Sequence, residues 1–408
     1  MNRKNVTILG LILLMCLVAL FVFTGCGGSS STTTSQAGTG STTAAGATPT
    51  GDPVVIGAIV SATGAGAALG EQEKNTLEMM QTVINSSGGI LGRPVKIVVE
   101  DDKSDPKEAV TAANLLIGQE KAVAILAATT SSSTLAVKAI TAAKGMPQMA
   151  MAAANDITDT APADWIWRTP PKDSLAVARA LTYVSGTLKV KKIAILHDEN
   201  AFGSSGAAEI VKTAATYGLE IVGNESYKTN DADLTAQLTK LKGDNPEALV
   251  VWGTNPGPAL AAKNMKQLSM TIPYIGSHGI ANGTFIKLAG AAAEGVVLPA
   301  SKLLVPASIT DADQKKVTED FIHLYEVQYG QAPNPFAGYA YEAVTILADA
   351  IKRAGSTDAK AVQTALNSTK NFWGPDGAYN YTPTNHDGLV ADDMIMAKIQ
   401  GGAWVLAQ

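Results

Sequence analysis

The sequence predicts an α/β protein of two lobes, each built on a parallel sheet. Runs of Val, Ile and Leu that suit buried strands alternate with helical patterns, and the alternation extends over more residues than one such sheet holds. The predicted strands are 54–60, 94–100, 122–127, 192–197, 219–222 and 248–252. Between the last two, Leu234, Leu238 and Leu241 follow the i, i+4, i+7 spacing of one helical face.

The pattern changes after Ser301. Two long helices are expected there, and the spacing of Val317, Phe321 and Leu324 marks the first. A strand-like C-terminal segment rich in Gly, Asn and Pro follows. We expect this segment to complete the sheets and not to form a third domain.

Composition excludes several classes of function. The chain has 408 residues, 46% hydrophobic and 16% charged, with a net charge of −5, so a basic surface for nucleic acid is not expected. Two cysteines and four histidines are too few for a zinc ribbon, an iron–sulfur cluster or a disulfide framework. We therefore expect no metal, no cofactor and no nucleic-acid partner.

The N-terminus has the pattern of an export signal. Arg3 and Lys4 precede an apolar run over 6–23, and small residues follow, which predicts a signal peptide over 1–25. Residues 23–26 resemble the bacterial lipobox, which implies lipid attachment at Cys26 and a location outside the cytoplasm, anchored to the membrane. An uncleaved anchor helix is the alternative. Residues 26–53 are rich in Ser, Thr, Gly and Ala and predict a flexible tether.

Polar turns follow several of the predicted strands, where ligands of parallel sheets bind. Residues 129–134 are all Ser or Thr and open a helix, and free N–H groups with added hydroxyls suit a carboxylate. One hydroxyl would serve as an ordinary N-cap, but six exceed that need. The turn over 61–70 does not match a dinucleotide loop, because its third glycine is Gly70 and not residue 69.

An enzyme is not expected. His197 and Asp198 are neighbours on a strand and so point to opposite faces, and no Gly-x-Ser-x-Gly elbow is present in the sequence. A hydrolase that uses Ser131 or Ser132 remains an alternative, to be tested by turnover of esters and amides.

From Val54 to its end the chain resembles the type I periplasmic binding proteins of ABC importers, specifically the leucine/isoleucine/valine-binding group. The matching stretches are 70–73, 85–92, 100–109, 131–134, Arg168-Thr169, 195–198, Phe202-Gly203, 276–282 and 293–296. The resemblance implies two Rossmann-like lobes joined by three hinge crossovers, near 168–170, 298–300 and 373–375. The first lobe would then hold 54–169 and 300–373, and the second 170–299 and 374–408.

The resemblance also implies a ligand site between the lobes. Ser131 matches the family's carboxylate-binding serine, and Ala152 falls in the loop that contributes backbone groups. Other positions depart from the family pattern: Ala154 replaces a Thr, Leu69, Phe202 and Thr254 replace tyrosines, and His278 replaces the acidic residue that accepts the ligand's ammonium group. Ser132 and Trp252 complete the expected ligand-binding set.

The replacement at His278 leaves two kinds of ligand open. In the first case the ligand is a small aromatic or aliphatic acid with no cationic end, because a buried ammonium group without a carboxylate partner is costly; Trp252, Phe202 and Leu69 would form apolar walls around it. In the second case another acidic residue of the protein contacts the ammonium group, and a branched-chain amino acid binds. The resemblance implies delivery to ABC permease subunits in the membrane, and a ligand-sensing receptor of the same fold is the alternative.

Overall fold

The computed structural model describes residues 48–407, which belong to one compact unit of the chain. The predicted signal peptide at 1–25, the lipidation site Cys26 and most of the predicted tether over 26–53 lie outside the described residues. Within 48–407, no helix combines the length and the apolar character needed to cross a membrane.

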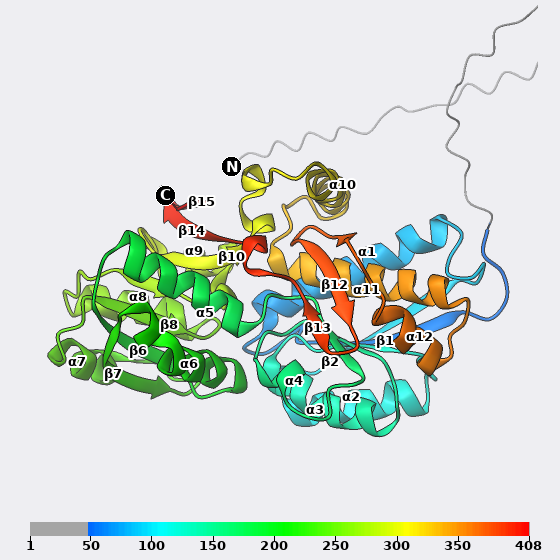
Figure 1. Cartoon of the computed structure of the whole chain (residues 1–408), viewed down its shortest axis with the longest axis horizontal. Helices are drawn as coiled ribbons and strands as arrows, with labels where there is room; N and C mark the ends of the chain where they lie inside the picture. Colours follow the sequence, from blue (N-terminus) through cyan, green and yellow to red (C-terminus); the bar gives the residue numbers. More distant parts are fainter. Residues whose placement is uncertain (1–47, 408) are drawn as a thin grey trace, which may run out of the picture. The chain divides into compact units, whose positions relative to one another are not determined.

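The first lobe begins with a five-stranded parallel sheet in the order β2-β1-β3-β4-β5. Its strands β1 and β2 are labelled in the right half of Figure 1. Its elements are β1 (Val54–Val60), α1 (Ala67–Ser86), β2 (Val95–Asp101), α2 (Pro106–Gly118), β3 (Ile125–Ala127), α3 (Ser131–Ala143), β4 (Gln148–Ala150), α4 (Asp156–Asp159) and β5 (Ile166–Arg168). The expected strand 54–60 is found with these bounds, whereas the strand expected over 122–127 starts only at Ile125.

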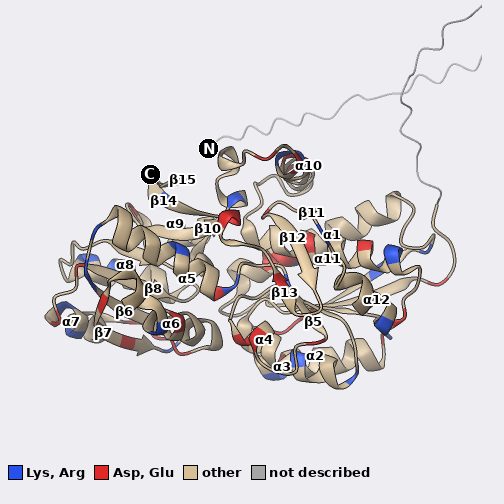
Figure 2. Ribbon diagram, in the orientation of Figure 1, with Lys and Arg blue, Asp and Glu red and all other residues tan. Residues whose placement is uncertain are grey.

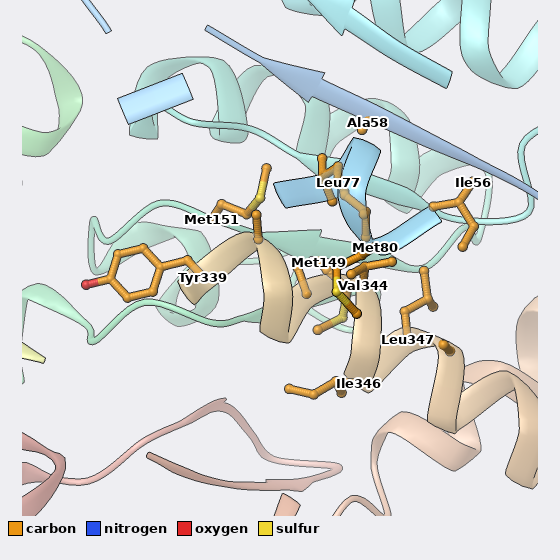
Figure 3. Close-up of a cluster of buried hydrophobic side chains, with 14 of the residues drawn as sticks. Ile56, Ala58, Leu77, Met80, Met149, Met151, Tyr339, Val344, Ile346 and Leu347 are labelled. Atoms are coloured by element: carbon orange, nitrogen blue, oxygen red, sulfur yellow. The ribbon is translucent and has the colours of Figure 1, made fainter. Parts of the chain in front are cut away.

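Helices cover both faces of this sheet, as its apolar strands require. Ile56 and Ala58 of β1 face a core shared with α1, while Ile59 faces a second core shared with α2. Three later helices join the first lobe: α10 (Ala312–Tyr329), α11 (Pro335–Ala354) and α12 (Ala359–Leu366). In the first core, Val344 and Leu347 of α11 lie with Leu77 and Met80 of α1 (Figure 3).

The second lobe has a seven-stranded sheet in the order β15-β14-β10-β9-β8-β6-β7. Its elements are α5 (Asp173–Thr182), β6 (Lys192–Asp198), α6 (Ala201–Thr213), β7 (Glu220–Tyr227), α7 (Thr235–Gly243), β8 (Ala248–Trp252), α8 (Gly257–Gln267), β9 (Tyr274–Gly276), α9 (Gly283–Ala289), β10 (Val297–Ser301), β14 (Met394–Gln400) and β15 (Ala403–Leu406). Strands β6 to β10 are parallel, and β14 and β15 add an antiparallel edge.

Short helical turns connect these elements. They are η1 (Tyr183–Thr187), η2 (Ala214–Tyr217), η3 (His278–Ile280), η4 (Gly290–Ala292), η5 (Lys302–Leu304), η6 (Pro306–Ser308) and η7 (Ala391–Asp393). Among them η3 matters most here, because it begins at His278.

The chain passes between the lobes three times: after β5, after β10 and before β14. Two expected boundaries need correction. Strand β10 runs to Ser301 in the second sheet, so the second passage comes after 301 and not at 299/300. The third passage comes later than 373/374, because Tyr379, Tyr381 and Leu389 are buried in the first core. These residues accompany a three-stranded sheet of β11 (Phe372–Trp373), β12 (Ala378–Thr382) and β13 (Asn385–Gly388).

Two carboxyl groups are buried beside these passages. Ser301 Oγ donates to Asp376 Oδ1, and the Asp376 N–H donates to Glu342 Oε1 at 2.7 Å. Tyr379 contacts Glu342 and donates its hydroxyl to the Thr169 carbonyl at 2.7 Å, so the group joins the first passage to the second. Burial raises the pKa of Asp376 to about 7 and raises that of Glu342 well above its usual range. We name Ser301, Glu342, Asp376 and Tyr379 the crossing cluster.

Candidate functional site

A cavity of about 240 Å³ lies between the carboxyl ends of the strands of both lobes. Its lining residues are Ala65, Gly66, Leu69, Ser104, Pro106, Thr129, Thr130, Ser131, Ser132, Met151, Ala152, Ala153, Pro170, Asn200, Phe202, Thr229, Thr254, His278, Gly279, Phe336 and Tyr339. This is the position at which open parallel sheets bind ligands, and domain interfaces are common sites for small molecules.

The N-terminus of α3 forms the first-lobe wall. Thr130 caps the helix by accepting from the Ser133 N–H at 3.3 Å, which leaves Ser131 and Ser132 as the first two helical residues. Among the hydrogen bonds of residues 48–407, none has the N–H of Ser131 or Ser132 as donor. Free N–H groups at the positive end of a helix, next to two hydroxyls, form a site for an anion.

The loop after β4 completes this wall. The Ala154 N–H donates to Ser131 Oγ at 3.2 Å, so the serine hydroxyl hydrogen remains available to a ligand. Arg168 lies fully buried behind the loop and donates from Nη1 to the Ala154 carbonyl at 3.0 Å. Its charge is balanced by Asp387, whose Oδ1 lies 3.1 Å from Arg168 Nε. The guanidinium group therefore holds the loop in place without reaching the cavity.

The second-lobe wall is aromatic. His278 packs edge-on against Phe202 and Trp252, with ring centroids 5.3 Å and 5.8 Å away. Gly279 keeps this wall close: a Cβ atom there would lie 2.7 Å from Phe202 and 3.0 Å from the Thr254 methyl group. Burial, and secondarily the charge of Arg168, lowers the pKa of His278 to about 3, so its imidazole is neutral.

Several hydrogen bonds join the lobes beside the cavity. The Ala201 N–H at the start of α6 donates to Ser132 Oγ at 3.3 Å. Asn155 donates its N–H to Ser205 Oγ at 2.9 Å and its Nδ2 to Glu209 Oε2 at 3.1 Å. The cavity is therefore enclosed by lobes that touch each other across it.

The structure brings most of the expected site residues together. Leu69, Ser131, Ser132, Ala152, Phe202, Thr254 and His278 line the cavity. Ala154 and Trp252 do not. Ala154 lies behind the wall, where its N–H contacts Ser131. Trp252 is fully buried and donates Nε1–H to Asp173 Oδ1 at 3.1 Å. A glycine at 206 permits this position, since a Cβ there would lie 2.0 Å from Trp252 Nε1.

Thr129 and Thr130 also line the cavity and belong to the hydroxyl run over 129–134 that the sequence indicated. Other lining residues were not named as ligand contacts from the sequence, although Ser104 and Asn200 lie in polar turns that a search of strand ends can find. Phe336 and Tyr339 come from the first turn of α11, far along the chain. Figure 3 shows Tyr339 pointing away from the aliphatic cluster that the rest of the helix joins. No local pattern indicates which lobe this helix joins.

The geometry suits binding better than catalysis. In the described part of the chain, the hydroxyls of Ser131 and Ser132 form no hydrogen bond with a His, Asp or Glu side chain, so neither has a base that would activate it. In the view of Figure 2, Lys and Arg are interspersed with Asp and Glu over the helices of both lobes and no basic face gathers. The enclosed cavity can hold a small molecule with an anionic end.

Comparison with known proteins agrees with this geometry. The family described as "Periplasmic binding protein" matches residues 53–403. A Leu/Ile/Val-binding protein of Rhizobium johnstonii is 29% identical over 357 residues, which cover 87% of this chain and 94% of that protein. An amino acid binding protein of Pseudomonas aeruginosa is 28% identical over 315 residues, covering 76% of this chain and 81% of that protein.

Solved structures agree as well. An extracellular ligand-binding receptor from Rhodopseudomonas palustris superposes with a TM-score of 0.82 at 25% identity, covering 88% of this chain and all of that one. The branched-chain amino acid transporter substrate binding protein LivJ from Streptococcus pneumoniae, solved with isoleucine, has a TM-score of 0.77 at 25% identity, covering 87% of this chain and 99% of that chain. The chain therefore belongs to the periplasmic binding protein family, in its type I leucine/isoleucine/valine-binding group.

Proposed function

We propose that this protein is the substrate-binding component of an ABC importer, and that it captures a branched-chain amino acid or a related small carboxylate between its lobes. One observation carries the proposal: the free N-terminus of α3, with Ser131 and Ser132, faces a cavity enclosed by both lobes. The carboxylate would accept hydrogen bonds from the Ser131 hydroxyl and from the first N–H groups of the helix.

Capture requires closure of the lobes and no covalent step. The hydrogen bonds from Ala201 to Ser132 and from Asn155 to Ser205 support this, because separating the lobes would break them. Closure around the ligand would then mark the loaded state that membrane permease subunits accept. The ligand would contact the expected residues that line the cavity, namely Ser131, Ser132, Ala152, Leu69, Phe202, Thr254 and His278. Ala154 and Trp252 would lie behind these residues and support them.

The predicted lipid on Cys26 would hold the body outside the cytoplasm beside its permease, on the tether over 26–53. This location follows the family, whose members bind solutes outside the cytoplasm, and the sequence of the N-terminus.

A thermal-unfolding screen of the purified protein tests the proposal. The panel holds amino acids, aromatic acids and short aliphatic carboxylates, with the matching amides as controls. A true ligand at about 100 times its Kd stabilises the folded state by roughly 2.7 kcal/mol. Stabilisation by at least one carboxylate, and not by its amide, supports the proposal. Stabilisation by none of the carboxylates, or turnover of an ester, contradicts it.

A further inference from the structure

The cavity lining carries no formal charge. None of the residues that line it in the described structure is Asp, Glu, Lys or Arg. The first-lobe wall offers hydrogen-bond donors that suit an anion, as described above. The second-lobe wall offers no counter-ion for a cation, so the two ends of a bound molecule meet different chemistry.

His278 is the polar side chain that the second wall presents most deeply. Its exposed fraction is 3%, and neither Nδ1 nor Nε2 has a hydrogen-bond partner within residues 48–407. Buried polar atoms without partners are rare and costly, so these nitrogens point to a ligand group that satisfies one of them. The neutral imidazole offers one N–H donor and one lone pair.

Nearby carboxyl groups do not replace the missing counter-ion. Glu73 lies behind Thr129 and accepts a hydrogen bond from the Thr129 hydroxyl, and burial raises the pKa of Glu73 to about 8. Asp198 lies behind Asn200 and Thr229 and accepts from them at 3.0 Å and 2.8 Å. Neither carboxyl group lines the cavity, so neither can touch a ligand in this arrangement of the lobes.

An ammonium group in this cavity would lose its water and gain no opposite charge, which is costly. We propose that the ligand is a small monocarboxylate whose second polar group is an uncharged hydroxyl or carbonyl that hydrogen-bonds His278, and that His278 selects it over the corresponding amino acid. The inference rests on the proposed function, since it takes the carboxylate end as given and names the other end.

Calorimetric titration of the purified protein with matched pairs of amino acids and hydroxy acids tests this inference. Each pair differs only in an ammonium or a hydroxyl group on the carbon next to the carboxylate: alanine and lactate, leucine and 2-hydroxy-4-methylpentanoate, phenylalanine and 3-phenyllactate. We expect the hydroxy acid to bind at least tenfold more tightly than the amino acid in the pair whose size fits. An amino acid that binds as tightly as its hydroxy acid, or more tightly, overturns the inference and leaves the proposed function standing. Failure of every carboxylate to bind overturns both.

Two variants test whether His278 is the residue that selects the hydroxy acid over the amino acid. His278→Glu places a carboxylate on the second wall, and we expect the preference between the matched pair to shift at least tenfold toward the amino acid. His278→Gln stays uncharged with one donor and one acceptor group, so the hydroxy acid should remain preferred. If His278→Glu is folded by circular dichroism and the preference does not move, His278 is not the selecting residue. If His278→Glu does not fold, loss of the preference in His278→Gln is the result that contradicts the inference.

Discussion

The ligand cavity and the crossing cluster both place polar groups between the lobes, yet they are built in opposite ways. The cavity has hydroxyls, helix N–H groups and a neutral imidazole, with no charged side chain on its lining. The crossing cluster holds two carboxyl groups with no basic partner among their hydrogen bonds. Ser301, Tyr379 and a backbone N–H donate to them, and Asp376 Oδ2 is left without a hydrogen-bond partner in the described structure. The difference shows that the negative charge in the cavity comes with the ligand. In the crossing cluster, buried carboxyl groups without a basic partner keep a proton instead.

Breaking the crossing cluster should have the largest effect. Glu342→Ala leaves the buried Asp376 N–H without its acceptor, removes the contact with the Tyr379 hydroxyl and opens a cavity, and we expect a loss of about 3–5 kcal/mol in the free energy of unfolding. Glu342→Gln keeps the shape and an acceptor oxygen, so its loss should be much smaller. Urea unfolding of both variants measures the difference. Equal losses would show that shape, and not the polar contacts, stabilises this region.

The pH dependence of stability should separate the two regions next. Asp376 has a folded-state pKa of about 7, above its usual value of 3.8, so the folded protein keeps a proton that the unfolded chain releases between these values. Stability from this group is therefore complete below about pH 4 and is lost as the pH rises to about 7, by on the order of 4 kcal/mol. The carboxyl group is surrounded by Glu342, Tyr339, Tyr379 and Asp393, and of these Glu342 shares its titration.

Asp376→Asn should flatten this slope in thermal unfolding between pH 5 and 8. Ligand binding over the same range should stay nearly constant, because His278 has a pKa of about 3 and remains neutral throughout. An unchanged slope in Asp376→Asn, or ligand affinity that falls steeply below pH 6.5, would contradict the comparison.

Removing a hydroxyl from the cavity should weaken binding without weakening the fold. Ser131→Ala deletes a donor to the carboxylate, and such a charged hydrogen bond is worth about 1.5–2 kcal/mol, or roughly tenfold to thirtyfold in Kd. Ser86→Ala, at an exposed serine of α1, is the matched control. Calorimetric titration gives the Kd of each. Unchanged affinity in Ser131→Ala would place the anion elsewhere.

Loosening the contact between the lobes should have the smallest effect. Asn155→Ala removes the Nδ2 bond to Glu209 at 3.1 Å and the cap on the Ser174 N–H at 3.0 Å, and we expect about 1 kcal/mol, roughly fivefold, in Kd. The control Asn114→Ala loses only an exposed bond within α2. Small-angle scattering with and without ligand would report closure. A variant that closes and binds like the parent would show that Asn155 does not hold the lobes together.

Local sequence patterns predicted most of the fold. Strands β1 and β8 lie at the predicted residues because each is a continuous apolar run with polar flanks. The tail was predicted less well: Tyr379 and Tyr381 pack into the first core while β14 and β15 pair in the second sheet. Which lobe receives a short strand depends on tertiary packing, which the period of the sequence does not encode.

The candidate site was likewise predicted only in part from the sequence. Ser131 and His278 were found because ligands bind where parallel strands end, and a search of strand ends reaches both. Tyr339 and Phe336 were missed, since they reach the cavity only through the packing of α11. Trp252 was expected to face the ligand, but the close approach of α6 at Gly206 buries it behind His278.

The most direct test of a ligand-supplied charge in this cavity is calorimetric titration with 2-hydroxy-4-methylpentanoate and its primary amide. The two molecules have the same shape and differ in the charge at the end that meets Ser131. The acid should bind at least tenfold more tightly than the amide. Equal affinity for both would contradict an anion site at the N-terminus of α3.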